Sequence, residues 1–398
     1  MPKIIVIGGG LGGAAAALAL HRRGFDVQVF EKSAILEEIG AGLNLSPNAL
    51  KAFRYLGIEE TAVGIGFQAR EQLIRNHRSG RVIARPRRMG DVEQRYGAQF
   101  LTMHRADLLK ILIAALPENI FYTNHQCISV KQEEGVATAV FANGETVEAD
   151  AIIGADGIHS AVRESLFGKI SPRFTGCICW RGLVPGHLLP DTKFGHQMVA
   201  WWGPHGHIVH YPVRREGSLV NFVAHYDSNE WTKESWTHEC DRSELLETYK
   251  NWNKNLLRLI EASEKYYKWA LYDRDPLDVW TNGLITLLGD AAHPMLPYLG
   301  QGACMAIEDG CVLAEVMAKK PTDLRRALID YEKLRKPRTT KAQMGSRIRA
   351  RQNHLASPFS RLRRDIRMAW NSWRGADSSA GQAAAFYDYD VAQEETWL

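Results

Sequence analysis

The sequence predicts an α/β fold in which a domain built on a parallel sheet is interrupted by a second, mostly antiparallel β domain. Three short apolar runs are typical of buried parallel strands: Ile4–Ile7, Ala151–Gly154 and Leu284–Leu288. Between residues 171 and 275 the helical periodicity weakens and strand patterns dominate. After about residue 320 the pattern becomes helical, so we expect a C-terminal helical region.

The expected domain limits follow these changes in pattern. The first domain would cover 1–170 and return at 276–320, the inserted domain would cover 171–275, and the helical region would cover 321–398. A chain of 398 residues is long enough for two domains of unequal size. Eight of the eleven tryptophans lie between Trp180 and Trp280, which sets the inserted segment apart in composition as well.

The composition is that of an ordinary soluble protein, with 45% hydrophobic and 24% charged residues, and excludes a disordered chain. A net charge of +4 is too small to indicate a nucleic-acid partner. The six cysteines show no zinc-ligand spacing, so we expect no metal site, and reduced thiols in the cytoplasm. Five glycines interrupt the uncharged run Ile4–Leu20, so we expect no membrane partner. The chain would act as a monomer or homodimer.

The C-terminal region is strongly basic. From Arg325 to Arg374 there are fifteen Lys and Arg residues against three acids, a local charge of +12. Such a surface could attract nucleic acid, a membrane or anionic substrates. Because no nucleic-acid motif accompanies the charge, we favour solvated helices that attract carboxylate substrates only as a side effect.

The remaining elements follow from periodicity and from turn residues. We expect four further helices: Ala14–Arg23 ending at Gly24, Pro47–Leu56, one around 101–116 opening near His104–Arg105, and one at about 303–318. We also expect a strand at Val27–Phe30, and short strands over 121–153 with a hairpin turn at Asn143-Gly144.

The first motif with chemical meaning lies between the first two strands. Gly8, Gly10 and Gly13 match the spacing G-x-G-x-x-G, with Leu11 inside it. The first glycine makes the tight turn, the second lets the backbone approach a pyrophosphate, and the third lets the helix pack on the strand. Glu31 ends the second strand, where its carboxylate can accept hydrogen bonds from ribose hydroxyls. Strand, glycines, helix, strand and acid in this order predict a Rossmann-like dinucleotide site for NAD(P) or FAD.

Two later motifs help to decide between NAD(P) and FAD. The central motif, Asp156-Gly157, follows the second buried strand, and the late motif, Gly289-Asp290, follows the third and is itself followed by a helix that opens at Gly302-Ala303. With the N-terminal glycine motif, the central motif and the late motif in this order, the chain resembles the single-component FAD-dependent aromatic hydroxylases, which have the p-hydroxybenzoate hydroxylase fold. Within this family, it most resembles the salicylate, 3-hydroxybenzoate and 6-hydroxynicotinate hydroxylases. The resemblance implies a Rossmann-like FAD-binding domain with an inserted substrate domain.

The resemblance also implies which residues hold FAD. Asp290 would accept hydrogen bonds from ribityl hydroxyls, and the helix opened by Gly302-Ala303 would point N–H groups at the flavin. Asp156, together with Arg163, would connect the FAD cradle with the NAD(P)H side. The full set of implied cofactor contacts is Gly8, Gly10, Leu11, Gly13, Glu31, Lys32, Asn44, Arg105, Cys127, Asp156, Asp290, Gly302 and Ala303.

The inserted domain contains a candidate catalytic pair. In a strand over residues 207–212, His207 and Tyr211 share one face, and His210 points to the other. The resemblance places this H-x-x-x-Y pair beside the substrate hydroxyl. A base that removes a phenol proton makes the ring electron-rich, and histidine suits this work near neutral pH. We expect His210 and His293 to be structural, with a pocket role for His293 left open because it follows the Gly289-Asp290 motif.

We therefore expect an FAD-dependent monooxygenase that uses NADH or NADPH and O₂ to hydroxylate a phenolic aromatic carboxylate through a flavin C4a-hydroperoxide. The substrate would be salicylate-like, a hydroxybenzoate or a hydroxynicotinate. One alternative is an FAD monooxygenase that acts on another heteroaromatic ring. An NAD-dependent dehydrogenase would explain Gly8–Glu31 but no later motif, and a non-catalytic FAD-fold escort is a third possibility. The exact substrate, the position hydroxylated and the choice of nicotinamide stay open.

Overall fold

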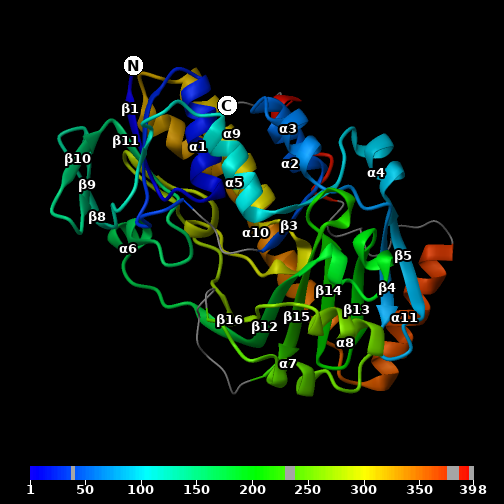
Figure 1. Cartoon of the computed structure of the whole chain (residues 1–398). Coiled ribbons are helices and arrows are strands. Elements are labelled where there is room, and N and C mark those ends of the chain that lie inside the picture. Colours follow the sequence, from blue (N-terminus) through cyan, green and yellow to red (C-terminus); the bar gives the residue numbers. More distant parts are fainter. Residues whose placement is uncertain (37–40, 229–237, 374–384, 394–398) are drawn as a thin grey trace.

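A computed structural model describes residues 1–36, 41–228, 238–373 and 385–393, and two large sheets dominate it (Figure 1). The first sheet has the strand order β17-β18-β11-β1-β2-β7. Its strands pair in parallel from β18 to β7, and β17 is antiparallel to β18. Its strands are β1 (Lys3–Ile7), β2 (Asp26–Phe30), β7 (Phe121–Tyr122), β11 (Ala151–Gly154), β17 (Thr281–Asn282) and β18 (Ile285–Leu287). The three predicted buried strands and the strand at Val27–Phe30 are thus confirmed.

Small residues let the helices around the first sheet pack closely against one another. Helix α1 (Leu11–Arg22) is a nearly continuous run of buried alanines and leucines, and it lies beside α9 (Gly302–Lys319) and α5 (Arg105–Ala114) in Figure 1. At their contact, a Cβ on Gly310 of α9 would lie 2.7 Å from the backbone nitrogen of Ala16. Glycine is therefore required there. This close packing fixes the starts of α1 and α9 relative to each other.

The second sheet has seven strands in the order β16-β12-β15-β14-β13-β4-β5. All its neighbours are antiparallel except β13 and β4, which are parallel. Two of its strands come from before residue 171, so the sheet draws on more of the chain than the expected insert. Its strands are β4 (Glu71–Asn76), β5 (Val82–Arg88), β12 (Arg173–Pro185), β13 (Met198–Gly203), β14 (Gly206–Pro212), β15 (Leu219–Asp227) and β16 (Tyr267–Asp273).

The two faces of the second sheet have different partners. Trp180 and Phe222 on one face pack against α7 (Arg242–Thr248) and α8 (Lys254–Glu261). The sequence reading did not anticipate these two helices, because they are short and lie within a strand-rich stretch. The opposite face carries Tyr211, which lies against Gly42. This face turns toward the half of the molecule built on the first sheet, which we call the nucleotide-binding half after its predicted function.

The predicted helix around 101–116 begins at Arg105, at its expected opening, but the residues before this opening are not helical. Leu101–His104 form strand β6, which pairs with β3 (Gly42–Leu45), and the helix α5 begins at Arg105. All four residues of β6 are buried. A short apolar run buried on both faces carries no alternation, so it cannot be told from a helix start by periodicity.

The C-terminal region is helical as expected in the part that the structure describes. Helix α10 (Leu324–Asn353) reaches from α9 to the second sheet, because Arg335 pairs with Asp309 of α9 and Arg347 pairs with Asp273 of β16. Helix α11 (Pro358–Trp373) then lies beside β5 (Figure 1). Residues 374–384 and 394–398 of this predicted region lie outside the described residues.

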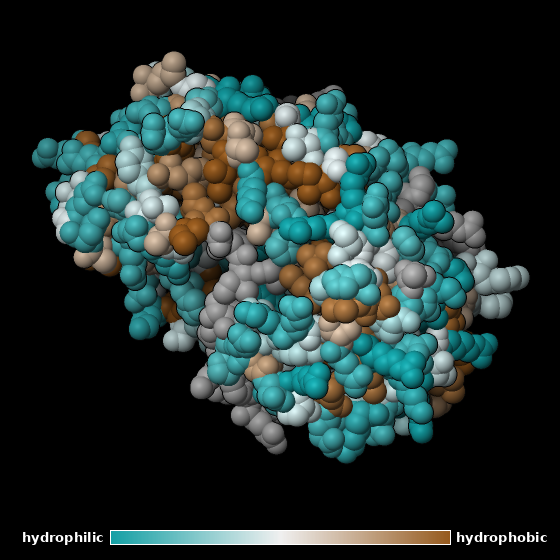
Figure 2. All heavy atoms as spheres, viewed as in Figure 1, coloured by the Kyte–Doolittle hydropathy of each residue, from teal (hydrophilic) through white to brown (hydrophobic). Residues whose placement is uncertain are grey.

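The other elements complete the described chain. They are α2 (Pro47–Tyr55), α3 (Glu59–Ile65), α4 (Met89–Tyr96), α6 (Ala161–Phe167), the sheet of β8 (Cys127–Glu133), β9 (Val136–Phe141) and β10 (Thr146–Ala149), and short 3-10 turns that include η4 (Gly289–Ala291) and η5 (Pro297–Leu299). Among the helices described, none combines the length and the apolar character needed to cross a membrane. Hydrophilic residues cover most of the face in Figure 2, with a hydrophobic band across its upper part.

Candidate active site

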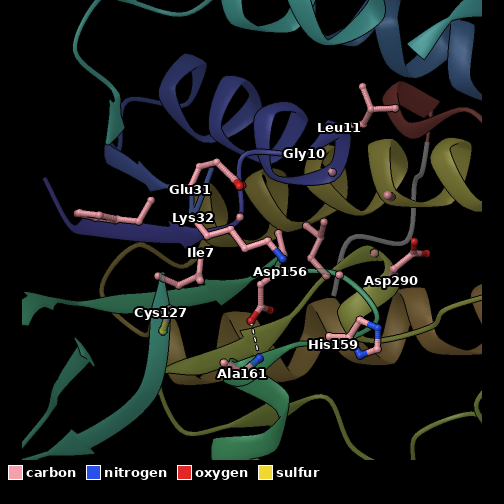
Figure 3. Close-up of a pocket in the computed structure, with 18 of the residues that line it drawn as sticks. Ile7, Gly10, Leu11, Glu31, Lys32, Cys127, Asp156, His159, Ala161 and Asp290 are labelled. Carbon is pink, nitrogen blue, oxygen red and sulfur yellow. Dashed lines mark hydrogen bonds between the residues drawn. The ribbon is translucent and has the colours of Figure 1, made fainter. Parts of the chain in front are cut away.

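A cavity of about 300 Å³ lies where the segments that follow β1, β2, β11 and β18 converge (Figure 3). In open α/β sheets, ligands bind at this carboxyl edge of the strands. Eleven of the thirteen predicted cofactor residues line the cavity: Gly8, Gly10, Leu11, Glu31, Lys32, Arg105, Cys127, Asp156, Asp290, Gly302 and Ala303.

The glycine turn shapes one wall of this cavity. Gly8 has a φ of +105°, a conformation that favours glycine, and its would-be Cβ lies 2.5 Å from the carbonyl oxygen of Ala155. Gly13 does not line the cavity, and a Cβ there would lie 1.9 Å from the carbonyl oxygen of Gly8. Its role is therefore packing of helix on turn, as its motif position predicts. Helix α1 begins without a capping side chain, so its first amides suit a phosphate.

The carboxylate of Glu31 is held in place by two backbone amides. Gly9 N donates to Oε2 at 2.7 Å, and Ser33 N donates to Oε1 at 2.9 Å. Each oxygen keeps a further lone pair with which it can accept a hydroxyl donor. Lys32 follows directly and also lines the cavity, so a negatively charged and a positively charged side chain lie next to each other after the end of β2 (Figure 3).

Asp156 of the central motif caps the start of helix α6 and also lines the cavity. Asp156 accepts hydrogen bonds from Ser160 Oγ at 2.5 Å and from Ala161 N at 2.7 Å. Burial raises the pKa of this carboxyl, although these hydrogen bonds oppose the shift. Arg163 is buried and donates to the carbonyl oxygens of Ile158 and Ala291. It therefore ties the central motif to the late Gly289-Asp290 motif.

Asp290 and Arg105 bring opposite charges to the same cavity. The Asp290 side chain is exposed to the cavity. The protein that encloses it on the other sides raises the pKa of its carboxyl by desolvation, and His293 and Arg105 oppose this shift. Burial lowers the pKa of Arg105, and Asp290 opposes that shift. Gly302 and Ala303 lie at the start of α9, whose N-terminus also has no capping side chain.

Asn44 lies outside the cavity lining. Its amide lies against the backbone of Gly300, where a Cβ would be 2.9 Å from Asn44 Nδ2. Sequence reasoning missed several lining residues: Ile7, Gly12, Phe30, His125, Gln126, Ala155, Gly157, His159, Ala161, Leu288, Gly289 and Ala306. Most of these belong to the three motifs, and Ala306 follows Ala303 by one helical turn. His125 and Gln126 carry no signal in a single sequence.

His207 and Tyr211 lie on one face of β14, and His210 lies on the other, where it contacts Phe194 at 4.9 Å between ring centroids. His207 is buried, stacks on His225 at 4.4 Å, and lies 5.6 Å from Tyr298. Burial raises the pKa of Tyr211, so its hydroxyl stays protonated. Burial and neighbouring cations lower the pKa of His207 well below its ordinary value, so its ring is neutral at pH 7. Neither residue lines the cavity described above.

The cavity fits FAD, as its glycine cradle, its two uncapped helix starts and its ribose-binding carboxylate indicate. Comparisons with known proteins agree. The FAD binding domain family matches residues 1–346. The 3-amino-4-hydroxybenzoate 2-monooxygenase of Streptomyces platensis is 39% identical over 91% of this chain and 91% of its own length. The 6-hydroxynicotinate 3-monooxygenase of Pseudomonas fluorescens is 36% identical over 86% of this chain and 89% of its own length.

Solved structures extend the same result to the fold. HpxO of Klebsiella pneumoniae, solved with FAD and uric acid, matches with a TM-score of 0.87 and 25% identity, covering 97% of each chain. A salicylate hydroxylase substrate complex matches with a TM-score of 0.79 and 25% identity, covering 97% of this chain and 98% of that one. These matches favour a flavin enzyme over a dehydrogenase or an escort. The chain belongs to the FAD binding domain family and is an FAD-dependent aromatic monooxygenase with the p-hydroxybenzoate hydroxylase fold.

Proposed function

We propose that this monooxygenase hydroxylates an aromatic ring that carries both a phenolic hydroxyl and a carboxylate, with NADH or NADPH as reductant and O₂ as oxidant. The named substrates of its relatives, 3-amino-4-hydroxybenzoate, 6-hydroxynicotinate and 3-hydroxybenzoate, share these two groups. The eleven predicted cofactor residues that line the cavity are proposed as FAD contacts, and bound FAD would supply the redox and oxygen chemistry. We propose the domain limits of the sequence analysis, with β4 and β5 assigned in addition to the second domain because they belong to its sheet.

The observation that carries the proposal is a buried, neutral imidazole on the sheet face that turns toward the nucleotide-binding half. A neutral His207 can accept the phenol proton and make the ring more electron-rich. Tyr211 stays protonated and orients the substrate by hydrogen bonding instead of acting as a base.

Asn221 offers a further donor on this face. It is fully buried and pairs with Tyr211 across β14 and β15. Its Oδ1 accepts from Gly42 N at 3.0 Å, whereas its Nδ2 has no hydrogen-bond partner among the described residues. A buried donor without a partner costs free energy unless a ligand satisfies it. We assign Asn221 Nδ2 to a substrate oxygen.

A screen of hydroxybenzoates and hydroxypyridine carboxylates tests the function. Consumption of NADH and of NADPH, O₂ uptake and product mass are measured together, and the proposed class should give a product heavier by one oxygen atom. Urate is included because HpxO was solved with uric acid. Hydroxylation of urate, with no product from any phenolic carboxylate, would favour the heteroaromatic alternative.

His207→Gln is expected to lower the rate of hydroxylation on the order of 10²- to 10⁴-fold, which is the usual contribution of a general base. FAD content should stay unchanged, because His207 does not line the FAD cavity. His210→Gln is the matched control, since it alters the same strand on the opposite face. Rates of product formation near pH 7 with the best substrate measure the effect, and a near-wild-type rate for His207→Gln contradicts the assignment.

A further inference from the structure

His207 is the inner end of a chain of hydrogen bonds that runs toward solvent. Its Nδ1 lies 2.8 Å from Nε2 of His354, and Nδ1 of His354 lies 2.5 Å from Oδ1 of Asp227. Exposure rises along the chain: His207 is 3% exposed, the His354 side chain 7% and the Asp227 side chain 41%. The three residues come from β14, from the end of α10 and from β15, so no local motif in the sequence connects them.

With both imidazoles neutral and the Asp227 carboxylate ionised, these contacts permit one arrangement of protons. The Asp227 carboxylate can only accept, so Nδ1 of His354 carries the hydrogen that it receives. In neutral His354, Nε2 is then an acceptor, and Nδ1 of His207 must be the donor to it. Nε2 of His207 is thereby left with its lone pair, and it makes no hydrogen bond to the described residues. The chain thus presents a proton acceptor at its inner end.

The surroundings of His207 disfavour a positive charge on its own ring. His225 of β15 stacks on it, Arg349 of α10 and Arg364 of α11 repel a cation, and Tyr298 of η5 lies close but stays neutral. Burial lowers the pKa of His225 to about 3, so this neighbour stays neutral as well. The only carboxylate that the structure describes in hydrogen-bond contact with this chain is Asp227, and it faces His354. A charge formed at His207 is therefore better placed at His354.

We propose that His354 and Asp227 form a proton relay for His207, an inference that rests on the proposed function. The phenol O–H bond breaks and its proton binds Nε2 of His207. The proton on Nδ1 of His207 passes to Nε2 of His354, and the resulting imidazolium is paired with the Asp227 carboxylate near solvent. No electrons are transferred in this step, and the proton leaves through Asp227 to water. His354 and Asp227 act through His207 and are positioning residues.

Asp227→Asn tests the relay in the FAD-bound enzyme, because asparagine can still accept the His354 hydrogen bond but carries no charge. We expect hydroxylation at pH 7 to fall on the order of 10- to 100-fold. The acidic limb of the pH profile of kcat should move up by about one pH unit or more, because the phenol must then ionise without help. The substrates are 3-amino-4-hydroxybenzoate, 6-hydroxynicotinate and 3-hydroxybenzoate, whichever the wild type converts. Asp227→Glu should restore part of the rate.

Two further measurements separate the relay from a structural role. The imidazole N–H proton of His354, hydrogen-bonded to a carboxylate, should give a downfield proton NMR resonance that disappears in Asp227→Asn and in His354→Gln. Asp275→Asn is the matched control, because Asp275 is an exposed acid paired with Arg347 of the same helix α10. It should leave the pH profile and the resonance unchanged.

Three results would overturn the relay. The first is a pH profile of Asp227→Asn that superimposes on that of the wild type. The second is the absence of the downfield resonance from the wild-type holoenzyme. The third is a bound metal ion, because Cys177, Asp227 and His354 place possible ligand atoms within 4.8 Å of one another, so elemental analysis must find no stoichiometric zinc. If the wild type hydroxylates no phenol, the proposed function fails instead, and the resonance still tests the hydrogen-bond chain.

Discussion

Gly13→Ala is expected to remove most FAD binding. A Cβ at this position would lie 1.9 Å from the carbonyl oxygen of Gly8, which is backbone and cannot rotate away. The first turn of α1 must therefore move, and with it Leu11 and Gly12, which line the cavity. Overpacking of this kind costs about 1–3 kcal/mol. If this cost falls on the FAD-bound geometry, FAD affinity drops roughly 10- to 100-fold.

Equilibrium titration of the apoprotein with FAD, followed by flavin fluorescence, measures the effect. Gly64→Ala is the matched control, because Gly64 also lies in a helix but a Cβ there meets nothing within 4 Å. That control should bind FAD normally and gain up to about 1 kcal/mol of stability, since alanine is the better helix former. Wild-type affinity in Gly13→Ala would mean that the first turn of α1 does not contact FAD.

The contrast between these two glycines shows what a sequence can predict. The motif spacing assigns Gly13 to helix packing because the spacing fixes which residues meet locally. The same reasoning recovered the cavity-lining ends of β1, β2, β11 and β18, since parallel strands bring their carboxyl ends together. Local pattern also located α1, α2 and α9 to within three residues at each end.

What the sequence could not provide depends on contacts between distant segments. His354 follows the last residue of α10, 147 residues after His207, and no spacing rule joins the two. The strand Leu101–His104 has a helix-like composition, and only its pairing with Gly42–Leu45 makes it a strand. Asn44 was expected at FAD, and the structure places it against Gly300, outside the cavity lining, so its contact with FAD stays a prediction. Sequence order defines the motifs, whereas tertiary packing decides which side chains reach the cavity.

A buried ion network behind the cavity was also invisible in the sequence. Arg335 of α10 is fully buried and pairs with Asp309 and Glu308 of α9, each at 2.7 Å. Asp309 also contacts His293 Nε2 at 2.6 Å and accepts from Gly289 N at 3.2 Å. The network therefore holds the segment that carries Asp290 against α9 and α10. His293 has the structural place that the sequence analysis expected.

Arg335→Met should destabilise the enzyme by about 3–5 kcal/mol, because it removes the buried guanidinium that pairs with both carboxylates and leaves Asp309 with no arginine partner. In a protein of this size, that corresponds to a fall in Tm of roughly 4–6 °C, measured by thermal unfolding with excess FAD. Arg326→Met is the matched control on the same helix, since the Arg326 side chain is 55% exposed and the buried Asp330 carboxylate keeps Lys320 and Lys333 as partners. Loss of this exposed partner is expected to cost about 0–1 kcal/mol.

The pH dependence of this difference identifies its cause. Burial alone would raise the pKa values of Glu308 and Asp309, but Arg338 and Arg335 lower the first, and His293 and Arg335 lower the second. A carboxyl whose pKa is lowered in the folded state stabilises the protein at pH values above the pKa it has in the unfolded chain, which is near 4. This contribution is lost as the pH falls through the folded pKa. In Arg335→Met the buried carboxyls can protonate at higher pH, so the gap in Tm should be widest near pH 7 and should narrow toward pH 5. A gap that does not change with pH would show that lost packing, and not lost charge, destabilises the variant.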